Sequence, residues 1–82
     1  MAASLVPGLR VTDRPETELE MVQRHVHDGE KRVARQMEMV AELERLHRDE
    51  AAALGRELLA VMRRTLDLAK HHLHDIQERP KR

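Results

Sequence analysis

The 82-residue chain contains no cysteine, phenylalanine, tryptophan or tyrosine, and these absences exclude several kinds of protein. Without cysteine there is neither a disulfide framework nor a zinc site with thiolate ligands. Without aromatic rings the chain lacks the large anchors that dominate small cores and binding hot spots, so aliphatic side chains must do all the packing. A chain of this size is also near the lower limit for a core that is stable alone.

Net charge and long apolar runs are also lacking. The 15 basic and 15 acidic residues balance, so no overall field attracts nucleic acid or an anionic membrane, and no aromatic ring is present to stack on bases. The apolar residues 2–6 precede Pro7 and Gly8 and form too short a run for a signal peptide or a membrane-spanning helix. We therefore expect a soluble, cytoplasmic protein without a membrane or nucleic-acid partner.

Residues 54–76 carry more apolar surface than one partner helix can bury. One row of apolar residues recurs at alternating spacings of three and four, as in the seam of a coiled coil. With a second row beside it, the apolar arc covers about 160°, whereas a helix with one neighbour needs roughly 100°. The first row is Leu59, Met62, Leu66, Ala69, Leu73 and Ile76, and the second is Leu54, Leu58, Val61 and Leu68.

The same spacing predicts an earlier helix over residues 14–46. Asp13 is a suitable N-cap, with Thr12 as the alternative, and Pro15 is tolerated in a first helical turn. Met37 and Met39 widen its apolar face on either side. Its seam is Leu19, Val22, Val26, Gly29, Val33, Gln36, Val40, Leu43 and His47.

Two seam positions are unusual for a coiled coil. Gly29 indicates either close approach of a facing helix or a break after Asp28, and the unbroken spacing favours the continuous helix. Gln36 either fixes the register through a polar partner or lies at the edge of the seam, and the pattern does not choose between them.

The spacing is interrupted after residue 46, which predicts a turn at 47–49 and a second helix over 50–78 with Asp49 as its N-cap. The alternative is one continuous helix, because the linking residues include no Gly or Pro. The expected fold is all-α: an antiparallel two-helix coiled-coil hairpin over residues 13–79, preceded by a flexible arm at 1–12 and followed by a tail at 80–82. Folding about residue 48 or 49 places Gly29 opposite Ala69.

Histidine is the one residue type that suggests a metal site. Five of the six histidines fall near one end of the expected hairpin, where His25, His72 and His74 are candidate ligands for a transition metal or groups of a pH sensor. Their spacing matches no known metal motif, so exposed polar histidines are the favoured interpretation. No phosphate-binding loop or nucleophile–base pair is present, and we expect no catalytic residue, enzymatic activity or cofactor.

The strings RPETELEMVQRHV, VARQMEMVAEL and LLAVMRRTLDLAKHHL, within residues 14–73, resemble a group of short, uncharacterised bacterial proteins. The group shares RPETEL near the start, an ARQ-containing first helix and a second helix of the type LL…LxLHxxHL. Members often have a Gly-Leu-Pro turn, which this chain lacks. The resemblance implies a helical hairpin and brings no established activity.

The leading hypothesis is a protein–protein interaction module that self-associates, most simply as a homodimer forming a four-helix bundle. The alternative is a small adaptor or regulator whose apolar surface binds a helix of another protein. The predicted interface consists of Met37, Met39, Leu54, Leu58, Val61 and Leu68.

Overall fold

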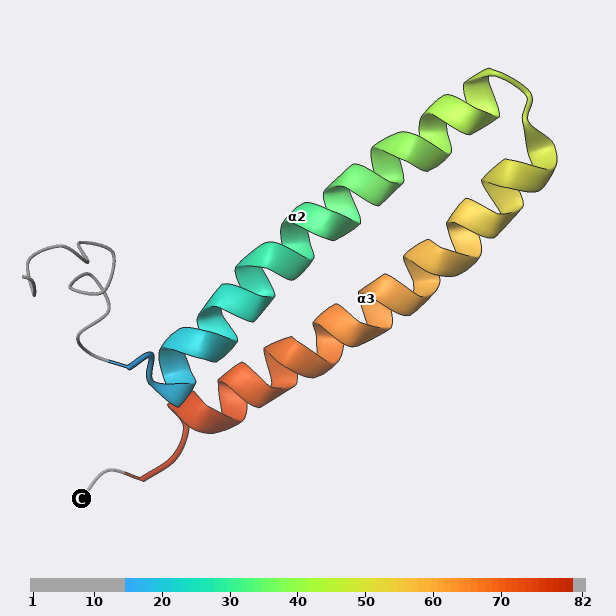
Figure 1. Ribbon diagram of the computed structural model, residues 1–82. Helices are drawn as coiled ribbons and strands as arrows, with labels where there is room; N and C mark the ends of the chain where they lie inside the picture. The colour runs from blue at the N-terminus through green and yellow to red at the C-terminus, as the bar shows by residue number, and fades with distance from the viewer. Residues whose placement is uncertain (1–14, 81–82) are drawn as a thin grey trace, which may run out of the picture.

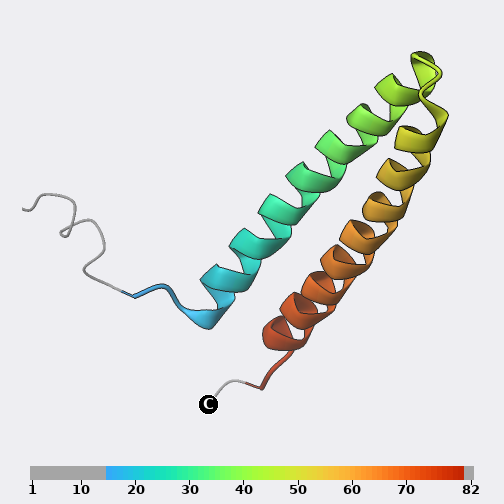
Figure 2. The same ribbon diagram turned by 45° about the vertical axis from the view of Figure 1, so that its right-hand side comes forward.

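The computed structural model describes residues 15–80, which form two antiparallel helices, α2 (Glu18–Arg45) and α3 (Asp49–Gln77). Figures 1 and 2 show the helices side by side, joined by a tight turn at one end. No strand occurs within the described range. The predicted all-α fold class, a two-helix hairpin, is confirmed. The expected arm at 1–12 lies outside the described residues, and Pro80 is the one described residue of the expected tail.

Helix α2 begins later than expected, because a stronger cap follows Pro15. The Glu20 backbone N–H donates to Thr17 Oγ1, and the Thr17 N–H donates back to Glu20 Oε1, each over 3.0 Å. This reciprocal capping box satisfies two helix-terminal donors at once. The expected start at residue 14 is therefore corrected to Glu18, and Asp13, the expected cap, lies outside the described residues.

The turn occupies residues 46–48, between the last residue of α2 and the first of α3. The backbone N–H of Arg48 donates to the Leu43 oxygen over 2.9 Å, and that of His47 donates to the Glu44 oxygen over 3.0 Å. These paired bonds close a helix C-cap that requires a left-handed residue, and His47 has φ 58°. Glycine usually occupies this position, because a side chain there costs free energy.

Helix α3 starts immediately after this cap, so the expected role of Asp49 is corrected. Arg48 occupies the N-cap position without a side-chain hydrogen bond, and Asp49 is already in the first turn of the helix. Its carboxylate is still favoured there by the positive end of the helix dipole. The helix ends at Gln77, where the Glu78 N–H bonds the His74 oxygen over 2.9 Å.

The core is a thin stripe, because two helices can cover only one side of each other. The first row of α3 faces α2, with Leu59 and Leu66 buried, whereas the second row stays exposed. The buried apolar residues are Val22, Val40, Ala52, Leu59 and Leu66, and Gln36 is buried among them.

Gly29 lies within an unbroken α2, as the close-approach interpretation predicts. A Cβ placed on Gly29 would lie 3.0 Å from Leu66 Cδ1, so the facing side chain takes the space that a larger residue would fill. The nearest facing residue is therefore Leu66 and not Ala69, which corrects the expected pairing by one turn of α3.

Candidate interaction surface

A strip of exposed apolar side chains runs along α3, and we call Leu54, Leu58, Val61 and Leu68 the α3 strip. Leu54 and Leu68 are each 67% exposed, and Leu58 and Val61 are each 51% exposed. With Thr65, their spacing alternates between four and three residues, which keeps them on one side of a helix. The strip has no apolar cover within residues 15–80.

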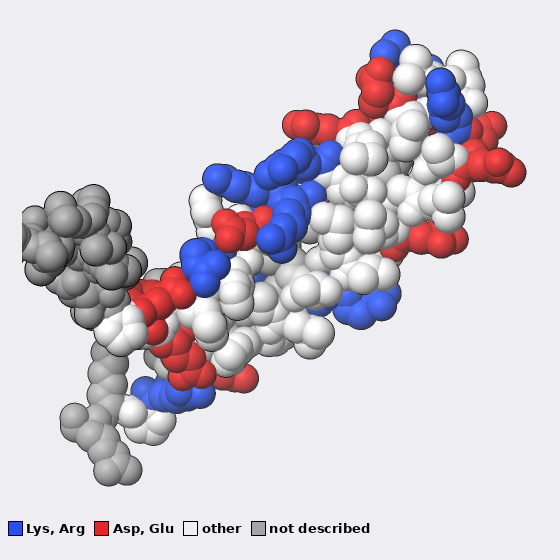
Figure 3. Space-filling model, viewed as in Figure 1, with Lys and Arg blue, Asp and Glu red and all other residues white. Residues whose placement is uncertain are grey.

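The strip borders a groove of about 460 Å³ between the two helices. Val61 belongs to both the strip and the groove wall, so the two share one face. Figure 3 shows a broad uncharged area on that face, spanning both helices and flanked by charged groups. Helix α2 lines the groove with Arg24, His25, Asp28, Gly29 and Arg32, and helix α3 lines it with Val61, Met62, Thr65, Leu66 and Ala69.

Met39 shares the groove face. It follows Arg32 by seven residues, or about two helical turns, so the two side chains project from the same side of α2. Leu46 follows Met39 by seven residues in turn. Met39 is 54% exposed and Leu46 is 48% exposed, so both extend the apolar area towards the turn.

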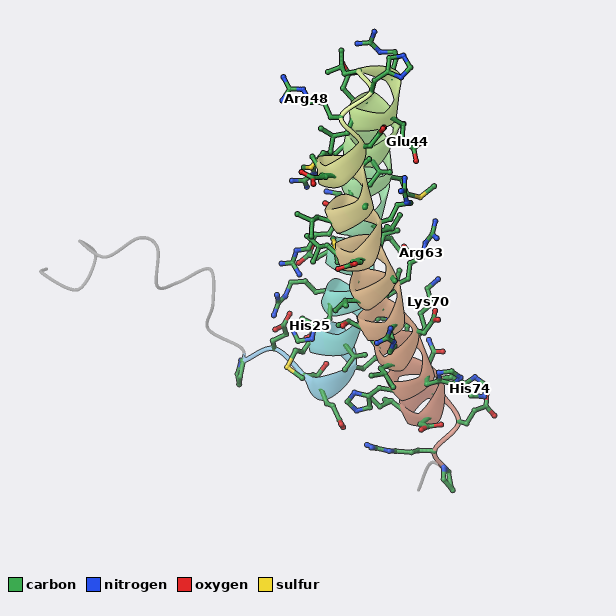
Figure 4. The ribbon with its side chains drawn as sticks, turned by 90° about the vertical axis from the view of Figure 1, so that its right-hand side faces the viewer. His25, Glu44, Arg48, Arg63, Lys70 and His74 are labelled. Atoms are coloured by element: carbon green, nitrogen blue, oxygen red, sulfur yellow. The ribbon has the colours of Figure 1, made fainter. Side chains whose placement is uncertain are left out.

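Met37 lies on the opposite face, since it is about 200° around α2 from Met39. It is seven residues from both Glu30 and Glu44, which pair across the hairpin with α3. Figure 4 shows Glu44 and Lys70 on one side of the hairpin and His25 of the groove on the other. The six residues predicted as an interface therefore do not share one surface, and Met37 is separate from the other five.

Ion pairs cover the face opposite the groove. Arg56 Nη1 lies 2.5 Å from Glu44 Oε2, and Lys70 Nζ lies 3.7 Å from Glu30 Oε2. The four side chains are about half exposed, so each pair is worth only a few tenths of a kcal/mol to about 1 kcal/mol. The face opposite the groove is thus covered by charged side chains in contact with water, and the groove face carries the exposed leucines.

Glu18 connects the open ends of the two helices. Its carboxylate accepts a hydrogen bond from Arg79 Nη1 over 2.8 Å and lies 3.4 Å from His72 Nε2. The hydrogen bond from Arg79 is the main reason that the pKa of Glu18 is lowered from its usual value of 4.5.

A second ion pair ties the chain before α2 to that helix. Arg24 donates two hydrogen bonds of 2.9 Å to the two oxygens of Glu16. These bonds lower the pKa of the carboxyl and raise that of the guanidinium. The charge of Arg24, at the groove wall, is thus already paired within the chain.

The candidate metal ligands do not converge. His25 lines the groove, His72 lies beside Glu18, and Figure 4 shows His74 on the opposite side of the hairpin from His25. Within residues 15–80 no group of three His, Asp or Glu side chains has the arrangement of a metal site. His71 Nδ1 contacts the Asp67 backbone oxygen over 3.0 Å.

Gln36 has a polar partner that the sequence pattern did not identify. Its side-chain Nε2 donates to the Gly55 backbone oxygen over 3.0 Å, and both residues are buried. A Cβ on Gly55 would lie 3.0 Å from Val40 Cγ2 and 3.5 Å from Gln36 Nε2, so glycine makes room for this contact. A glycine and a glutamine in facing seams are the signal that could have predicted it.

Comparisons with protein-family models, curated proteins and solved structures give no match for this chain. The resemblance through RPETEL and the two helix strings therefore stays a prediction. Neither α2 nor α3 combines the length and apolar character needed to cross a lipid bilayer, as judged over residues 15–80.

Proposed function

We propose that this chain is a non-enzymatic interaction module that binds a second copy of itself through the α3 strip. The observation that carries the proposal is the exposure of Leu54 and Leu68, each 67% exposed, within a strip that repeats at coiled-coil spacing. Scattered exposed leucines are common on soluble proteins, but a row at this spacing matches the surface that a further helix covers.

The α3 strip supports self-association because one apolar strip can pack directly against the identical strip of a second copy. A symmetric dimer uses the same patch on both subunits, so an uncharged row of leucine and valine meets an equally apolar row. The matching side of α2 is largely charged apart from Met39 and Leu46, with Asp28, Arg32 and Arg35 along it. Helix α3 therefore carries the contact, and the result is a dimer of four helices.

The small core gives a second reason for the proposal. Five apolar side chains are buried among the 66 residues at positions 15–80, and none of them is aromatic. When two copies cover each other's strips, each Å² of apolar surface that is buried stabilises the dimer by about 25 cal/mol. We therefore expect dimerisation and thermal stability to be linked, with a melting temperature that rises with protein concentration.

Analytical ultracentrifugation across micromolar concentrations tests the proposal. The wild-type chain is expected to sediment as a dimer, and the double variant L58D/V61D as a helical monomer, because an unpaired carboxylate in an apolar contact is costly. M37D is the matched control: Met37 is 47% exposed, similar to Leu58, but lies on the ion-pair face. The control is expected to remain dimeric.

A wild-type chain that is folded and monomeric throughout this range would refute self-association. If that monomer bound an added amphipathic helix through the α3 strip, the adaptor function would replace it. Equal weakening by M37D and by L58D/V61D would show that the contact is not confined to the groove face.

A further inference from the structure

We propose that the two copies pair with their α3 helices antiparallel and with the two-fold axis midway between Leu58 and Val61. This inference rests on the self-association proposed above and adds the orientation and register of the subunits. Ala51 and Thr65 continue the spacing of the α3 strip, and this extended row forms the seam between the two copies. The layers are Leu58 with the partner's Val61, Leu54 with the partner's Thr65, and Leu68 with the partner's Ala51, each occurring twice.

The shape of the groove agrees with this register. Thr65 is a short side chain in the groove wall, flanked by the small residues Gly29 and Ala69. The partner's Leu54, among the most exposed side chains of the strip, falls on Thr65 and extends over the groove. A large side chain thus meets the hollow that small residues leave, as knobs meet holes in coiled coils.

Charges beside the strip distinguish this register from others. Glu57 and Arg64 each precede a seam residue, so they lie along the outer flank of the strip. In antiparallel pairs such flanking positions face each other, which places Glu57 against the partner's Arg64 twice. Glu50 likewise faces the partner's His71. Among residues 15–80, no ion pair within the chain uses Glu57 or Arg64.

Other arrangements lose this complementarity. A shift by one heptad towards the C-terminus brings Arg64 against the partner's Arg64 and places His72 in the seam. A shift by one heptad towards the N-terminus brings Glu57 against the partner's Glu57. A parallel pair sets Glu57 and Arg64 beside Met62 and Ala69 of the partner, because outer and inner flanks then meet. Among these arrangements, the antiparallel register centred between Leu58 and Val61 is the one that pairs Glu57 with the partner's Arg64 and brings no like charges together on the outer flank.

Helix α2 gives independent support. The glycine contacts show which residues of the two helices lie at the same height, since Gly55 faces Val40 and Gly29 faces Leu66. An axis midway between Leu58 and Val61 therefore crosses α2 close to Gln36. Arg32, in the groove wall, then lies within reach of the partner's Glu42. In the register shifted by one heptad towards the C-terminus, Arg32 lies instead near the partner's Arg35.

Charge reversal at Glu57 and Arg64 tests the register. E57R and R64E are each expected to weaken self-association about tenfold, because two attractive contacts per dimer become repulsive. Mixed together, the two variants are expected to form mainly heterodimers, in which every flanking pair is again attractive. The double variant E57R/R64E, with both charges exchanged, is expected to recover dimerisation. Native mass spectrometry separates the species by mass, and circular dichroism checks helicity.

Disulfide trapping gives a second test, since the chain contains no cysteine. A mixture of L54C and T65C is expected to form a mixed disulfide on mild oxidation. Crosslinking of L54C with H72C would indicate the shifted register, and crosslinking of L54C with itself would indicate a parallel pair. A monomeric wild-type chain overturns both proposals. A dimer without heterodimer preference, or with either alternative crosslink, overturns the register and leaves self-association standing.

Discussion

Gly55 and Gly29 allow one substitution to be tested in two environments. Both lie inside helices, where alanine is favoured over glycine by about 1 kcal/mol. At Gly55 the new Cβ would lie 3.0 Å from Val40 Cγ2. Val40 is buried, and a β-branched side chain in a helix has essentially one rotamer. The Cγ2 methyl group of Val40 therefore cannot rotate away from the added Cβ. Overpacking of this kind costs about 1–3 kcal/mol.

The Gln36 hydrogen bond adds to the expected loss at Gly55. Helix separation that relieves the contact with Val40 also lengthens the 3.0 Å bond to the Gly55 oxygen, and a net hydrogen bond is worth about 0.5–1.5 kcal/mol. After subtracting the helix-propensity gain, we expect G55A to be destabilised by about 1–2 kcal/mol. For a domain of this size that lowers the melting temperature by roughly 5–10 °C.

G29A has the opposite expectation. Its Cβ would lie 3.0 Å from Leu66 Cδ1, the end of a flexible side chain that borders the open groove. Because Leu66 borders the groove, we expect its terminal methyl to shift aside, so G29A should range from neutral to about 1 kcal/mol more stable. Thermal melts followed by circular dichroism at equal protein concentration compare the two variants. A G55A protein as stable as G29A would refute the packing argument.

Three further predictions concern the helix ends. H47G should raise the free energy of unfolding by about 1 kcal/mol, because it removes a side chain from a left-handed residue, and urea unfolding measures it. T17A should lower it by about 1 kcal/mol by breaking the capping box with Glu20. The depressed pKa of Glu18 implies that its pair with Arg79 stabilises the fold above its ordinary pKa and is lost as pH falls through the folded-state value. The difference in melting temperature between wild type and E18Q should therefore be fully present above the ordinary pKa of 4.5 and shrink as the pH falls below it.

The antiparallel hairpin was predictable because the alternation of three and four in both segments belongs to a helix seam. That pattern also separated the α3 row that faces α2 from the row that stays exposed. Periodicity predicts which face of a helix is buried, but it says little about how far one helix is shifted along the other. The expected partner of Gly29 was therefore Ala69, one helical turn away from the observed partner Leu66.

The helix ends were harder to predict because several residues compete for each cap. Asp13 and Thr17 are both suitable, and Thr17 prevails in the structure because Glu20 completes its capping box. The left-handed conformation of His47 was not predictable from the residue type, because glycine usually occupies this position. It follows from the backbone hydrogen bonds of His47 and Arg48 that close the helix.

The candidate surface was predictable in part. Met37 and Met39 were grouped because both lie beside the seam of α2. They lie on opposite sides of that seam, however, so in a two-helix hairpin they belong to opposite faces. The candidate metal ligands do not meet for the same reason. Residues close in height, such as His25 and His74, project to different sides, so proximity along a helix axis does not bring ligands together.

Gln36 links the fold to the proposed dimer. The turn at residues 46–48 sets the height of α2 against α3 at one end of the hairpin, and apolar packing alone specifies that height less sharply than a polar contact does. The bond from Gln36 to the Gly55 oxygen and the fit of Gly55 against Val40 exist at one height only. That height decides which α2 charges accompany the α3 strip, including Arg32 opposite the partner's Glu42. We therefore expect Q36L to retain helicity but to reduce the heterodimer preference of E57R for R64E, because the middle of α2 is then held less firmly in register with α3.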